Sequence, residues 1–158
     1  MSEAYHVMEQ DLVNTCLQNN DLIPTIRASL HPRVFIDHGL RHLYMTMLRM
    51  ADEGQPIDHL TLELESSQDP EFAQYFDDKQ DVADTIAQIN GKAANESMWE
   101  VYAEKVNRNF ERKYSALCAK KASEKIANGQ PVEDVLHDME SRINTVSQSL
   151  KKPFKPFT

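Results

Sequence analysis

The sequence predicts an all-α protein, built as a small helical globular bundle followed by a long helical hairpin. No segment of the 158 residues alternates apolar and polar side chains with the period of two expected of a half-buried strand. The chain has only 4 glycines and 7 prolines, few for an all-β protein, because tight turns between strands consume glycine. Apolar residues instead recur at intervals of three and four, the spacing of a helix that buries one face.

The N-terminal part of the chain is expected to fold as a bundle of short helices. Pro24 fits only in the first turn of its helix, where backbone amides have no partner within the helix. Gly54 can adopt the left-handed conformation that ends a helix, and Pro56 prevents continuation. Asp58 then suits the N-cap of the following helix. The apolar residues of that helix are Leu60, Leu62 and Leu64. We therefore predict helices over 4–18, 21–29, 39–53, 59–66 and 82–90, and a helical turn over 71–76.

The last third of the sequence predicts two long helices joined by a tight turn. Residues 128–131 end one helix and begin the next, because glycine stands just past one end and proline near the following start. The apolar stripe of the first helix is Tyr102, Val106, Phe110, Tyr114 and Leu117. That of the second is Val132, Val135, Met139, Ile143, Val146 and Leu150, spaced as in a coiled coil. We expect a globular subdomain over 1–96, the hairpin over 97–148 and the start of a linker over 149–158.

Three motifs occur in the order and spacing of a known family. An opening helix carries Glu9 and Gln10 ahead of an apolar run, and an Ala-Ala-Asn turn at 93–95 precedes the helix that holds Tyr102. Between them, an extended piece, a helix and a turn match the family at Phe35, Arg41, Leu43, Tyr44, Gly54, Pro56, Ile57 and Asp58. With these motifs the sequence resembles the N-terminal domain of the DnaB-type replicative DNA helicases over almost its whole length.

The resemblance implies a scaffold rather than a catalyst. In that family the hairpins pair into dimers, and the dimers form a collar above a hexameric motor ring. The collar binds primase and, in some systems, a helicase loader, whereas ATP and Mg belong to the motor domain. An ATPase needs a glycine-rich loop that wraps the phosphates and leads into Lys-Ser or Lys-Thr. The four glycines here are far apart and none precedes such a pair, so we expect neither enzymatic activity nor a cofactor in this chain.

The hairpin is the predicted site of self-association into a dimer or higher oligomer. Two helices of this length cannot bury both apolar stripes against each other alone, so a further partner surface is expected. The family supports the hairpin as an interface, and the periodicity supplies the individual residues. The predicted interface residues are Tyr102, Val106, Arg108, Phe110, Arg112, Tyr114, Val135, Met139, Ile143 and Val146. The alternative hypothesis is a free-standing phage- or plasmid-type regulator that copies this domain and binds or inhibits a host helicase or primase.

The charge distribution bears on the class of partner. A net charge of −8 has the wrong sign for a free-standing binder of duplex DNA, so any DNA contact is expected to be weak or indirect. The segment 52–84 holds eleven acidic residues against Lys79, whereas 105–125 holds seven basic residues. These segments are either solvated helix faces or complementary surfaces that pair subunits or recruit a partner.

Cysteine usage and hydropathy indicate a cytoplasmic protein. Cys16 and Cys118 lie on apolar faces, form no CxxC pair and suggest buried thiols in a reduced protein. No apolar run approaches the roughly 20 residues of a membrane span, and the N-terminus has no signal-peptide character. We therefore expect no contact with a membrane.

The remaining candidate residues have simpler structural interpretations. His38 and His42 lie four apart but lack a third ligand, so we expect surface or interface histidines and no metal site. Trp99 is expected to pack in the core, with an anchor in a subunit interface as the alternative. Phe154 and Phe157 could stack on bases, but a linker held against a neighbouring domain explains them more simply.

Overall fold

The computed structural model describes residues 3–152, which contain helices and connecting turns but no strand, and this confirms the all-α prediction. Phe154 and Phe157 lie outside the described residues. The α-helices are α1 (Glu3–Gln18), α2 (Ile23–Arg27), α3 (His38–Asp52), α4 (His59–Gln68), α5 (Lys79–Asn90), α6 (Trp99–Ala127) and α7 (Val132–Ser149). Short 3-10 turns are η1 (Asn20–Leu22), η2 (Pro32–Val34), η3 (Phe72–Gln74) and η4 (Glu96–Met98). None of the helices in this range is both long and apolar enough to cross a lipid bilayer.

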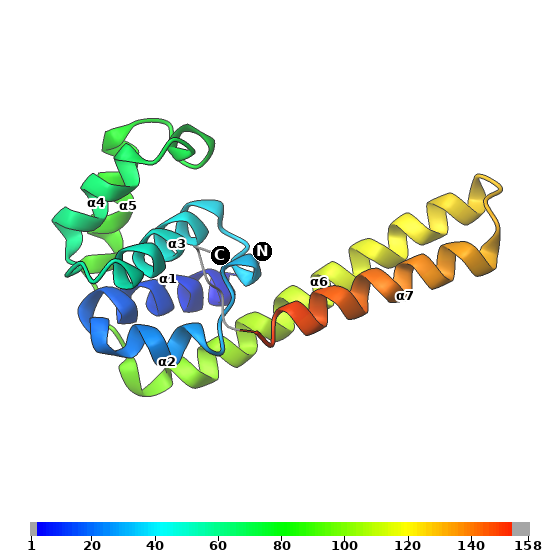
Figure 1. Cartoon of the computed structure of the whole chain (residues 1–158), viewed down its shortest axis with the longest axis horizontal. Coiled ribbons are helices and arrows are strands. Elements are labelled where there is room, and N and C mark those ends of the chain that lie inside the picture. Colours follow the sequence, from blue (N-terminus) through cyan, green and yellow to red (C-terminus); the bar gives the residue numbers. More distant parts are fainter. Residues whose placement is uncertain (1–2, 153–158) are drawn as a thin grey trace.

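The molecule has a globular part and a projecting arm (Figure 1). Helices α1 to α5 gather in the globular part, and α6 runs along its edge before extending away from it. Helix α7 returns beside α6, so the two form the predicted helical hairpin. The positive φ angles of Gly54 (70°) and Gly129 (92°) end α3 and α6, as the sequence predicts.

The hydrophobic core joins the globular part to the base of the hairpin, where α6 begins and α7 ends. Tyr44 of α3 is fully buried and donates its hydroxyl hydrogen to the Leu30 carbonyl over 2.7 Å. The core also contains Trp99, Ala103, Val106 and Phe110 from the first part of α6. Val146 from the last turn of α7 and Leu150 just after it belong to the same core. Trp99 is therefore a core residue. The globular core continues past residue 96, the boundary expected from the sequence, into the first turns of α6.

Capping side chains set the helix starts, and one of them moves a predicted boundary. Asp58 and Thr61 form a reciprocal capping box at the start of α4, which confirms the predicted N-cap. Helix α5 begins at Lys79, three residues earlier than 82, because Asp78 accepts a hydrogen bond from the Asp81 amide over 2.8 Å. The segment predicted as one helix over 21–29 is split into η1 and the short α2.

Glu9 is a buried carboxylate that joins α1 to the start of α3. Its side chain is fully buried, and it accepts the amide hydrogens of Ile36 and Asp37, each over 3.1 Å. Asp37 in turn caps α3 by accepting from the Leu40 amide, and it lies 3.1 Å from the His6 ring. Burial raises the pKa of Glu9, while the two amide hydrogen bonds lower it. The glutamate of the opening motif thus organises the chain turn that leads into α3.

His42 is a core residue, which corrects the expectation of a surface or interface histidine. Its ring is 3% exposed and stacks on Tyr75, with ring centroids 4.7 Å apart. Phe76 meets the same ring edge-on at 5.9 Å. Burial lowers the pKa of His42, so the neutral ring is favoured in the folded protein. These ring contacts pack the segment that leads into α5 against α3. His38, one turn earlier on α3, is exposed.

Candidate protein-interaction surface

Many residues of the predicted interface lie inside the chain itself. Val106, Phe110 and Val146 are 1%, 8% and 5% exposed and belong to the core of the globular part. Val135 is also buried, at 6% exposure, against α6. Tyr102 and Tyr114 are half-buried and pack against the core. These side chains therefore contribute to the packing of a single copy.

The other predicted interface residues are accessible to different degrees. Met139 and Ile143 of α7 are half-buried, and Arg112 of α6 is exposed. Arg108 is also exposed and forms an ion pair with Glu104 over 2.5 Å, one helical turn away. Such exposed pairs contribute about 0 to 1 kcal/mol. The structure therefore places the predicted arginines on a solvated face of α6.

The hairpin leaves the globular part at Tyr114. The Tyr114 ring stacks on the Phe110 ring, with centroids 5.9 Å apart. The Arg33 guanidinium lies over the Tyr114 ring, 5.3 Å from its centroid. Beyond Tyr114, α6 packs mainly on α7, through buried Cys118 and Ala122. Two helices packed only on each other cannot bury all of their apolar side chains, so several side chains of the arm are exposed to solvent.

One flank of α7 is an exposed apolar surface, which we call the pairing flank: Val132, Leu136 and Ile143. Val132 is 51% and Leu136 43% exposed, and Ile143 is half-buried. Successive residues of an α-helix are separated by about 100°, so side chains seven positions apart, such as Leu136 and Ile143, point the same way. Sequence periodicity identified Ile143 and missed Leu136, because Leu136 follows directly after the seam residue Val135.

The other side of the hairpin carries a groove between α6 and α7, which we call the hairpin groove. Its volume is about 290 Å³. The apolar lining residues are Tyr114, Leu117, Cys118, Ala122, Val135 and Met139. The charged lining residues are Lys121, Lys125, Asp138 and Arg142. Asp138 accepts from Arg142 Nε over 2.9 Å and lies 3.8 Å from Lys125 Nζ, so these two cations share one carboxylate. The groove is apolar at its base and positively charged at its rim.

A second exposed apolar surface lies on α4, which we call the α4 ridge: Leu60 and Leu64. These side chains are 63% and 55% exposed, whereas Leu62 between them is fully buried. Residues two apart on a helix point about 200° away from each other, so Leu62 faces the core while Leu60 and Leu64 face solvent.

Comparisons with known proteins agree with this architecture. Residues 3–108 match the family model described as the DnaB-like helicase N terminal domain. Among solved structures, the chain is similar to the N-terminal domain of DnaB helicase from Mycobacterium tuberculosis, with 16% sequence identity and a TM-score of 0.72. That likeness covers 87% of this chain and 94% of the other, and it shows the fold. No curated protein matches the chain. The family model spans well over half of the sequence, so the chain belongs to the DnaB-like helicase N-terminal domain family.

Proposed function

We propose that this chain is a collar domain that holds the subunits of a replicative helicase together and offers a docking surface to primase or a helicase loader. Its family is that of the N-terminal domain of replicative helicases. The motor chemistry, with ATP and Mg, is assigned by family to a separate domain. The role proposed here is mechanical, because the chain provides surfaces rather than a reaction centre.

The pairing flank is the observation that carries self-association. Val132 and Leu136 are large apolar residues about half exposed on a projecting arm. Burying a large apolar side chain completely contributes about 1.5 to 3 kcal/mol. The flanks of two hairpins packed together would form a four-helix bundle, in which each copy covers the other's apolar side chains. The free energy of association is smaller than the burial sum, because two molecules lose translational and rotational freedom.

Protein partners suit the charge of this chain better than nucleic acid does. The net charge of −8 opposes direct binding to phosphates. The exposed cations that are present, such as Arg108 and Arg112, lie on α6 beside acidic residues and are solvated. A collar that contacts primase or a loader needs exposed apolar and charged protein surface, and the chain has both.

Sedimentation of two matched variants tests the proposal. The double variant Val132→Asp, Leu136→Asp places charges on the pairing flank and should sediment as a monomer at concentrations where the wild type associates. Val7→Asp is the control, because Val7 is 45% exposed on α1, close to the 43% of Leu136. Both variants should keep the wild-type helical circular dichroism. A wild-type chain that sediments as a monomer at high micromolar concentration would refute pairing through the hairpin.

A further inference from the structure

Leu60 and Leu64 form a ridge that the rest of the chain leaves uncovered. They lie four residues apart on α4, on the side opposite buried Leu62. Side chains at this spacing are neighbours on a helix surface, about 5 to 6 Å apart. Pairs of this kind are how a helix anchors itself in the groove of a partner.

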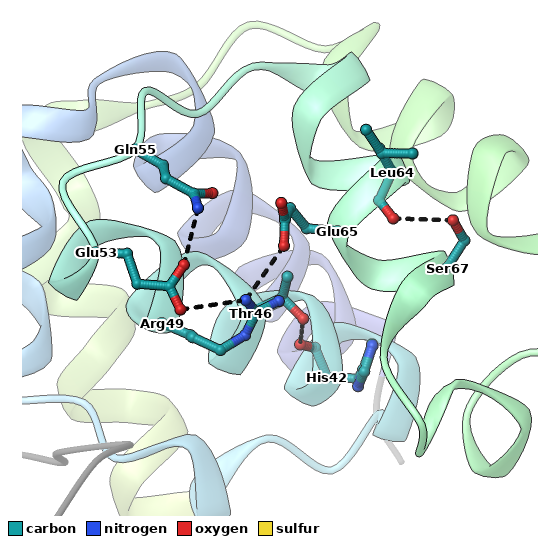
Figure 2. Close-up of polar contacts among 8 residues, drawn as sticks. All are labelled: His42, Thr46, Arg49, Glu53, Gln55, Leu64, Glu65 and Ser67. Carbon is teal, nitrogen blue, oxygen red and sulfur yellow. Dashed lines mark hydrogen bonds and ion pairs between the residues drawn. The ribbon is translucent and has the colours of Figure 1, made fainter.

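One ion pair between α3 and α4 holds the face of α4 that lies next to the ridge. Arg49 of α3 lies 3.2 Å from Glu65 and 3.6 Å from Glu53, and Glu53 also accepts from Gln55 over 2.8 Å. Figure 2 shows this cluster between α3 and α4, with Leu64 lying apart from it. Glu65 is thus held toward α3, and the leucines are held toward solvent.

The surroundings of the ridge are acidic. Glu63 lies beside the leucines on α4, is half-buried and makes no ion pair with any residue from 3 to 152. The segment 52–84, which contains α4 and the start of α5, holds eleven acidic residues and one lysine. An occupant that covers this ridge therefore needs an apolar surface with a positive rim.

The hairpin groove of the same chain has those two properties. Leu117, 47% exposed, is one of its apolar lining residues, and Lys121, Lys125 and Arg142 supply more positive charge than Asp138 neutralises. The groove extends along α6 from Tyr114 to Lys125. At 1.5 Å per residue that is about 16 Å, longer than the separation of two leucines on a helix.

We propose that the α4 ridge of one copy docks into the hairpin groove of a second copy. The proposal rests on the collar function, and it adds a contact that collar assembly requires. An interface in which both copies use the same surface closes on itself at two copies. A ring built from such pairs needs another contact between the pairs, and two different surfaces that fit each other can supply it. The ridge and the groove are two different surfaces of one chain, apolar at the centre and opposite in charge around it.

The test removes the pairing flank so that this contact is measured alone. In a chain carrying Val132→Asp and Leu136→Asp, the remaining self-association should be concentration-dependent and unlimited in size, as expected of head-to-tail contacts. Adding Leu60→Asp and Leu64→Asp gives a ridge variant, and adding Leu117→Asp instead gives a groove variant. Each should be monomeric, because burial of two leucines corresponds to about a hundredfold or more in Kd. All substituted side chains are at least 43% exposed, so folding should be retained, as circular dichroism would verify.

Mixing the ridge variant with the groove variant gives the decisive result. One intact ridge and one intact groove remain in the mixture, so a 1:1 heterodimer should form although neither chain associates alone. Glu63→Lys should weaken that heterodimer, and Lys121→Glu on the partner should restore it. A mixture that stays monomeric overturns the proposal, as does a groove variant that loses association while the ridge variant keeps it. These outcomes leave the pairing flank untouched, because wild-type pairing is measured separately in chains that retain Val132 and Leu136.

Discussion

Replacing Glu9 with alanine should destabilise the protein by about 3 kcal/mol, although Glu9 is a charged residue in an apolar core. The carboxylate is fully buried and accepts two backbone amides, from Ile36 and Asp37, at 3.1 Å each. Hydrogen bonds to charged groups contribute about 1.5 to 3 kcal/mol each, so the two contribute about 3 to 6 kcal/mol. Alanine also removes the cost of burying a carboxylate, the cost that raises the pKa of Glu9, and this places the net effect near the lower bound.

Thermal unfolding measures the effect, and two further variants identify its cause. For a protein of this size, 1 kcal/mol shifts Tm by about 2 to 4 °C, so Glu9→Ala should lower Tm by about 6 to 12 °C. Glu9→Gln keeps one acceptor oxygen and should lose roughly half as much. Glu3→Ala on the same helix removes an exposed carboxylate and should change stability by less than about 0.5 kcal/mol. If Glu9→Ala lies within about 1 kcal/mol of the wild type, the two hydrogen bonds do not organise the entry to α3.

Two further predictions concern buried titratable groups. Burial lowers the pKa of His42 below its ordinary 6.5, so the unfolded chain binds more protons in the range below pH 6.5 and stability should fall with falling pH. His42→Gln should reduce this dependence of the unfolding free energy on pH, measured by urea unfolding between about pH 7.5 and 5.5. The pKa of His31 is also lowered, so His31 should account for the dependence that remains. A dependence unchanged by His42→Gln would contradict the role given to His42. Burial raises the pKa of Cys16 to about 12, so Cys16 should resist a thiol reagent in the native protein. Cys118 lies in the hairpin groove and should react first, and equal labelling by mass spectrometry would contradict this.

Element types and their order follow from sequence because helix starts and stops are local. Gly54 and Gly129 end their helices with positive φ, and Asp58 caps α4, as the residue types require. The observed start of α5, at Lys79 rather than the predicted 82, also has a local cause. Asp78 is an N-cap, but an acidic run beside it resembles a solvated loop. Boundaries of this kind depend on which of several possible caps is used, and composition does not distinguish among them.

Which apolar residues lie in the core and which on the surface does not follow from sequence. Apolar periodicity predicts which side chains share a helix face, but not which element covers that face. The stripe from Tyr102 to Leu117 is continuous in the sequence, yet Val106 is buried by the globular part and Leu117 is 47% exposed. The difference arises where α6 leaves the globular part at Tyr114. Glu9 and His42 were missed as core residues for a related reason, since their partners are far away in sequence.

Charge and apolarity act at different stages of the proposed assembly. Opposite charges around the α4 ridge and the hairpin groove would accelerate encounter, and this effect is screened by salt over about 10 Å at 0.1 M. The pairing flank of α7 has no charged residue among its members, so salt should leave hairpin pairing almost unchanged. Raising the salt concentration should therefore slow ridge-to-groove association while dimers persist. A chain with one salt-sensitive and one salt-resistant contact would assemble in two separable steps, first into pairs and then into larger assemblies.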